Sequence, residues 1–170
     1  MKKILILFFF IINANNCYAE SSVAYININY ILNNSIVGLS ISNHIKEIKD
    51  SKIKEFKLLE KQLSEKESDI IKKKNIVEKA EFEKQVNILK EEINIFINKK
   101  KIFYDKVDKK KIKYTKTVLN TLNPIISKYV EDNSISIVFP KKNIIIAKKN
   151  LDITKPIIDL LNKKLTKIEF

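Results

Sequence analysis

A long stretch of apolar residues at helical spacing, from about Leu39 to Val130, takes up more than half of the chain. It contains no glycine, and its one proline, Pro124, lies near its end. Apolar residues recur three and four positions apart, which is the pattern of a coiled-coil seam. The seam residues are Ile41, Ile45, Ile48, Phe56, Leu59, Leu63 and Ile70 in the first part, and Phe82, Val86, Leu89, Ile93, Phe96, Phe103 and Val107 in the second. Such a segment must form long helices that pack side by side.

The seam loses its phase between Ile70 and Phe82, where the sequence is rich in lysine. One continuous helix of about 90 residues would extend roughly 135 Å. We predict instead a reversal near residues 75–79, which divides residues 36–131 into two antiparallel arms, each roughly 55 to 75 Å long. We call this predicted hairpin the tentacle.

The first residues have the pattern of a secretory signal peptide. Met1-Lys2-Lys3 is basic, Ile4 to Ile12 is apolar, and a small residue, Ala19, ends the segment. Because nine apolar residues are too few to span a bilayer, we predict that residues 1–19 are a cleaved signal peptide and that the protein is exported. The mature chain would contain no cysteine, so packing or oligomerisation must stabilise it.

The formal net charge is +13, and all 33 basic residues are lysines. Without arginine, the bidentate recognition of phosphate or guanine is missing, which disfavours a nucleic-acid partner, as the signal peptide also does. The densest lysine cluster lies between Lys99 and Lys116. It is either a solvated helix face or a positive surface that attracts acidic proteins or an anionic lipid surface.

The segments that flank the tentacle predict a second, smaller unit. Residues 23–28 have strand composition, and residues 134–139 and 143–147 read as the two strands of a β-hairpin. Ser35 is a candidate N-cap of the first arm, Gly38 suggests a close backbone approach, and Asn133 a left-handed C-cap of the second arm. A last helix is predicted from Lys155 to about Lys164, with Thr154 as its N-cap. The expected fold class is therefore α+β, with the tentacle projecting from a small β-rich body of residues 20–35 and 132–170.

The order of these segments resembles the Skp/OmpH family over nearly all of the mature chain. The resemblance rests on Val23 to Asn27, Asn34 to Gly38, the charged hairpin, Ile137 to Phe139, and above all Leu151-Asp152-Ile153-Thr154 before a helix ending Leu160-Leu161-Asn162. The resemblance implies a periplasmic chaperone, a homotrimer shaped like a jellyfish, whose three tentacles surround a cavity for unfolded outer membrane proteins. The chain differs in Asn27, in Asn133-Ser134 and in its lack of arginine, which puts any arginine-dependent lipid contact in doubt.

No catalytic, cofactor-binding or metal-binding pattern occurs in the sequence. The single histidine, His44, lies among the isoleucines of the first arm, and one glycine cannot build a phosphate-binding loop. We therefore expect no enzyme activity, no cofactor and no metal. The expected oligomer interface lies on the strands, because their apolar surface exceeds what a few short strands can bury. Its residues are Tyr25, Ile26, Ile28, Ile137 and Phe139. The candidate client contacts are Ile76, Val77 and Phe82 at the tip and Lys100, Lys109 and Lys111 on the second arm.

The leading hypothesis is an ATP-independent holdase that shelters unfolded outer membrane β-barrel proteins. The alternative is a structural coiled-coil protein of the cell envelope without chaperone activity. A hairpin that returns to a closing body favours the holdase, because a spacer rod has no need to reverse.

Overall fold

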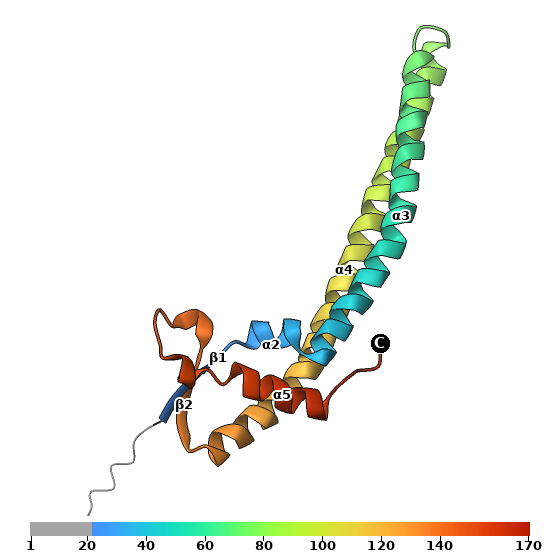
Figure 1. Ribbon diagram of the computed structural model, residues 1–170. Coiled ribbons are helices and arrows are strands. Elements are labelled where there is room, and N and C mark those ends of the chain that lie inside the picture. The colour runs from blue at the N-terminus through green and yellow to red at the C-terminus, as the bar shows by residue number, and fades with distance from the viewer. Residues whose placement is uncertain (1–21) are drawn as a thin grey trace, which may run out of the picture.

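The computed structural model describes residues 22–170, which form a long helical hairpin on a small body (Figure 1). The predicted signal peptide lies outside the described residues. In chain order the elements are β1 (Ser22–Ile26), α2 (Ile28–Asn34), α3 (Ile36–Lys72), α4 (Lys79–Asp132), β2 (Ile135–Pro140) and α5 (Thr154–Lys164), with 3-10 turns at Lys141–Asn143 and Lys149–Leu151. Within residues 22–170, every helix is too short or too polar to cross a membrane.

Helices α3 and α4 run antiparallel as the hairpin, 37 and 54 residues long. Residues 73–78 make the turn between them at the far end of the hairpin (Figure 1). The predicted seam is buried between the helices at Phe56, Ile70, Leu89, Phe96 and Val107. The Phe56 ring packs edge-on against Phe96 and Phe103, with ring centroids 6.0 Å and 5.5 Å away. The heptad pattern therefore predicted the hairpin correctly.

Two lysines that interrupt the seam find partners on the opposite helix. Lys66 of α3 donates to Glu92 of α4, with Nζ 2.7 Å from Oε2. Lys100 of α4 lies 3.9 Å from Glu60 Oε1 of α3, and its ammonium lies 5.2 Å from the centre of the Phe96 ring. These pairs are half exposed, so each adds little stability, but they allow a polar residue to occupy the seam.

A tight junction joins α2 to the start of α3. The Ser35 hydroxyl accepts a hydrogen bond from the Gly38 backbone N–H at 3.2 Å, so Ser35 is the N-cap, as predicted. Gly38 packs against the backbone of Leu32, and a Cβ at this position would lie 2.0 Å from the Leu32 carbonyl oxygen. The close approach expected at Gly38 is therefore present. Asn162 of α5 accepts from the Ile36 N–H at 2.8 Å and fixes the same helix start from outside.

Helix α2 was not expected from the sequence. It begins at Ile28, directly after β1, so Ile28 belongs to a helix and not to a strand. Asn27 is its N-cap, and its Oδ1 accepts from the Tyr30 N–H at 3.0 Å. The signal for this helix is short: an Asn cap followed by Ile28, Ile31 and Leu32 at helical spacing.

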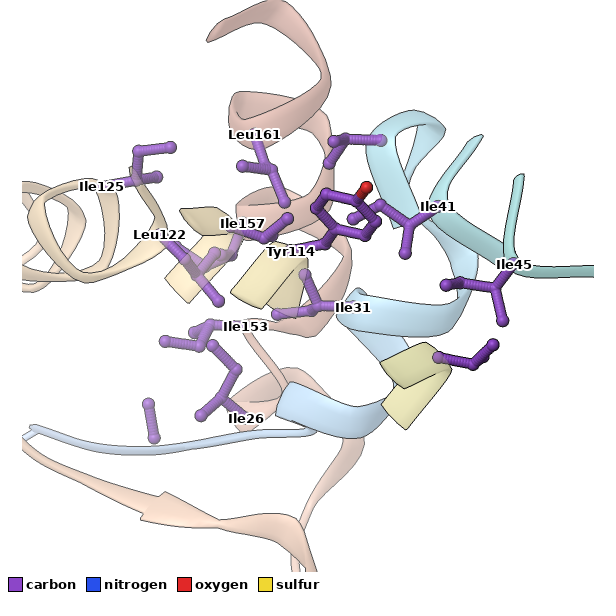
Figure 2. Packing of buried hydrophobic residues seen from close by; sticks show 14 residues of the cluster. Ile26, Ile31, Ile41, Ile45, Tyr114, Leu122, Ile125, Ile153, Ile157 and Leu161 are labelled. Carbon is purple, nitrogen blue, oxygen red and sulfur yellow. The ribbon is translucent and has the colours of Figure 1, made fainter. Parts of the chain in front are cut away.

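The core of the body is mostly helical, which corrects the expectation of a β-rich body. Figure 2 shows Ile31 of α2 and Ile157 and Leu161 of α5 packed with Tyr114 and Leu122 of α4. Strand β1 adds Ala24 and Ile26 at the edge of this cluster. Helix α5 fills the space that a larger sheet would have occupied, because its amphipathic face buries more apolar surface there than a short strand could.

The predicted β-hairpin of residues 134–147 is wrong. Strand β2 pairs in parallel with β1, with Val23 opposite Ile137 and Tyr25 opposite Phe139, in a two-stranded sheet. Residues 143–147 form no strand, and Ile145 and Ile146 are 104% and 90% exposed. The reason is that β1 is already anchored in the core through Ile26, so β2 gains more by pairing with it than by turning back on itself.

The ends of the helices also differ in detail from the expectation. Helix α4 continues through Pro124 to Asp132, and its last turns bend away from the hairpin (Figure 1). The left-handed residue after α4 is Ser134, with φ 51°, and not Asn133. Thr154, the predicted N-cap of the last helix, lies inside α5. Its backbone N–H donates to Asp152 Oδ1 at 3.0 Å, so Asp152, and not Thr154, provides the side-chain hydrogen bond at the start of the helix.

Candidate functional site

The functional candidates within residues 22–170 are binding surfaces. Within residues 22–170, no group of three or more His, Cys, Asp or Glu side chains lies close enough to hold a metal ion. His44 stacks on Phe170 with ring centroids 3.9 Å apart, and both lie at the base of the hairpin. The functional candidates are therefore the open face of the body and the surface of the hairpin.

The five predicted interface residues do not form one exposed patch. Tyr25 and Ile26 of β1 are buried within the chain, and Ile28 packs against the core from α2. Ile137 and Phe139 of β2 are about half exposed and alternate with Val138, so they lie on the same face of the strand. Of the five, only these two leave substantial apolar surface available to another chain.

The outer edge of β2 is the open edge of the sheet. One side of β1 is paired with β2, and on its other side Ile153 donates to the Tyr25 carbonyl at 3.0 Å. Strand β2 has no second neighbour among the described residues. An open edge with apolar side chains beside it is a template for strand addition. The exposed Ile145 and Ile146 follow in the next loop, and sequence reasoning missed them because it placed them in a hairpin.

The three apolar candidates at the tip are close together. Ile76 and Val77 lie in the turn, and Phe82 lies in the first turn of α4. Ile76 is largely exposed, whereas Val77 and Phe82 are half buried. The tip therefore presents one fully available apolar side chain and two that are partly covered.

The structure distributes the three candidate lysines over different surroundings. Lys100 lies at the seam beside Glu60 and Phe96. Lys109 is exposed on α4. Lys111 is also exposed and borders a hollow of about 610 Å³ between α2 and the base of the hairpin, with Lys46, Lys49, Ile41 and Ile45. The three lysines are thus spread along α4 and do not form one binding site.

Asp152 connects the start of α5 to Lys141, which follows β2. Partial burial opposes its ionisation, but hydrogen bonds from the side chain and backbone of Thr154, together with Lys141, outweigh burial and lower the pKa of Asp152 below its ordinary value. Lys141 Nζ lies 3.3 Å from Asp152 Oδ2 and 5.7 Å from the centre of the Tyr25 ring. The Asn27 N–H donates to Thr154 Oγ1 at 2.9 Å. The residues that carried the family resemblance therefore act in folding, by connecting β1, α2 and α5.

Comparison with known proteins gives the same architecture. The fold is similar to the crystal structure of a protein from Caulobacter crescentus CB15, provisionally named an outer membrane chaperone (OmpH-like), with a TM-score of 0.72, 19% sequence identity and 88% of each chain covered. No curated protein sequence matches the chain. The family model described as outer membrane protein (OmpH-like) matches residues 22–161, from the first residue of β1 into α5. Because this match covers most of the chain, the protein belongs to the OmpH-like outer membrane protein family.

Proposed function

We propose that the protein is a periplasmic holdase that binds unfolded outer membrane β-barrel proteins between the helical hairpins of a homotrimer. The observation that carries this proposal is the combination of a long, lysine-rich hairpin with a small body that keeps one open, apolar sheet edge. A chaperone of this kind needs neither a catalytic group nor a nucleotide site.

The assembly part of the proposal rests on the body. The outer edge of β2 and its apolar side chains, Ile137 and Phe139, would be covered by a second copy of the chain. The exposed Ile145 and Ile146 would be buried by the same contact. Two short strands are marginal alone, so association of bodies would stabilise the fold as well as position three hairpins around one cavity.

The binding part rests on the hairpin. Its two helices bury a narrow seam and leave apolar and cationic side chains along the outside. Many weak contacts can retain an unfolded chain without fixing one conformation, and positive potential attracts acidic clients. Unfolded β-barrel proteins carry open strand edges until the barrel closes, so enclosure prevents them from aggregating. The same positive surface gives a physical basis for contact with an anionic lipid surface.

The test is suppression of aggregation. An outer membrane β-barrel protein is diluted from urea into buffer without nucleotide, and light scattering is followed with and without the protein. We expect scattering to be suppressed at about one trimer per client, and native mass measurement to give a trimer. Unchanged scattering together with a dimer or a filament would favour the structural envelope coiled coil instead.

A further inference from the structure

Three exposed isoleucines lie one heptad apart on α4. Ile88, Ile95 and Ile102 are 43%, 49% and 45% exposed. Residues seven apart fall nearly on one line along a helix, so the three side chains form a row beside the buried seam. These side chains remain about half exposed, whereas the seam residues Leu89 and Phe96 are buried between α3 and α4.

Two hollows between the helices open beside this row. The first has a volume of about 280 Å³ and contains Ile95. Its apolar wall is formed by Leu59, Leu63, Ile95 and Phe96. The second has a volume of about 400 Å³, and Ile70 and Ile88 form its apolar wall. Lys66 borders both hollows, so both open on the same side of the hairpin. We call these two hollows, with Ile88 and Ile95, the isoleucine groove.

The groove is divided and narrow. The ion pair between Lys66 and Glu92 spans the two helices and separates the hollows. Ile88 and Ile95 lie about 10 Å apart at 1.5 Å per residue. In an extended chain of the polyproline II type, side chains three residues apart lie on one face at about 9 Å. Each hollow is therefore suited to one side chain of a single extended segment, and the groove is too small for a folded interface.

The charges around the groove determine which kind of segment it favours. Lys66 is neutralised by Glu92, and Asp69 pairs with Lys72. Lys73 borders the second hollow and Lys99 the first, and neither forms an ion pair with any residue in the described range 22–170. The rim thus keeps positive charge next to apolar walls. This combination is complementary to a segment with apolar side chains and carboxylates.

We propose that the isoleucine groove binds extended, acidic segments of an unfolded client, with one apolar side chain in each hollow and client carboxylates near Lys73 and Lys99. This inference rests on the proposed chaperone function and assigns client binding to one side of the middle of the hairpin, in addition to its tip. Two anchors with a polar division between them give weak, reversible binding, as a holdase requires.

The experiment compares two matched double variants. Ile88→Gln with Ile95→Gln removes the groove isoleucines. Ile97→Gln with Ile112→Gln is the control, because these residues are 57% and 67% exposed on the same helix and border neither hollow. All four side chains are exposed, so both variants should keep the helical circular dichroism of the wild type. The probe is a fluorescein-labelled, acidic outer membrane β-barrel protein diluted from urea, and its Kd is measured by fluorescence anisotropy.

We expect the groove variant to raise Kd about tenfold and the control to change it by less than about twofold. If wild type binds and both variants bind equally well, or both lose affinity equally, the groove is not the binding surface, although the chaperone function stands. If wild type itself does not bind the unfolded probe, the proposed function fails and this inference fails with it.

Discussion

The Cα of Gly38 faces the carbonyl oxygen of Leu32 so closely that a Cβ would lie only 2.0 Å from that oxygen. The contact joins α2 to α3 and involves backbone atoms, which cannot move aside as a flexible side chain could. Gly38→Ala must therefore separate the two helices, although alanine favours a helix by about 1 kcal/mol. We expect a net loss of about 2 kcal/mol in the free energy of unfolding, measured with urea. Ser42→Ala, at an exposed position of the same helix, should change it by less than about 0.5 kcal/mol.

The open edge of β2 predicts the effect of a charge at Phe139. Phe139→Asp places a carboxylate on the exposed apolar face where another copy is proposed to pack. We expect the trimer to dissociate and the melting temperature to fall, because burying an unpaired charge is costly. Analytical ultracentrifugation and thermal unfolding measure both. Ile112→Asp on the hairpin should leave the assembly intact. A Phe139→Asp trimer with unchanged melting would remove β2 from the interface.

Hydrogen exchange should separate the hairpin tip from the body. Residues 68–84 surround the turn, where few apolar side chains are buried, so their amides should exchange fast. Amides of β1 and of α4 near Val118 and Leu122 should exchange slowly, because they adjoin the core. Residues 144–148 should exchange fast in a monomer and become protected on assembly if they lie in the interface. Equal protection of tip and core would contradict a mobile hairpin.

The lysines of α4 should act mainly on the rate of client capture. Replacing Lys100, Lys109 and Lys111 with Gln removes positive charge from the hairpin, and long-range charge influences encounter more than final affinity. We expect slower association at low salt in stopped-flow experiments, with the trimer intact. Near 1 M salt, where the Debye length is about 3 Å, the difference should vanish. Replacing Lys163, Lys164 and Lys167, which are exposed at the end of α5 and just after it, with Gln is the matched control. If wild type and the variant at Lys100, Lys109 and Lys111 associated with the client at equal rates at low salt, these lysines would be only a solvated helix face.

Acid should weaken the body through Asp152. Its pKa is lower in the folded protein than the ordinary value of 3.8, so its contribution to stability is present above that value and is lost as pH falls through the lower folded value. Asp152→Asn should lower stability at pH 7 and flatten the pH dependence below about pH 4. Urea unfolding at pH 7 and at pH 3 measures both effects. A variant with the same acid sensitivity as wild type would show that other carboxylates dominate.

The sequence by itself determined the hairpin and the start of its first arm. A seam such as Phe82, Leu89 and Phe96 is a local repeat, and any long helix with that repeat must bury it against another helix. The Ser35 cap and the Gly38 contact are also local, because each involves residues within one or two turns. Such features depend on spacing along the chain, which the sequence displays directly.

Only the tertiary structure determined which strands pair and which helices pack together in the body. Strand β2 pairs with β1 more than a hundred residues away, and the nearer isoleucines at 145 and 146 remain exposed. The strand pattern is the same for either pairing, so the choice depends on which partner is already anchored in the core. Helix α2 and the row of Ile88, Ile95 and Ile102 were overlooked for a related reason. A short helix is formed by its packing against α5, and an exposed isoleucine becomes part of a groove only when the opposite helix supplies the other wall.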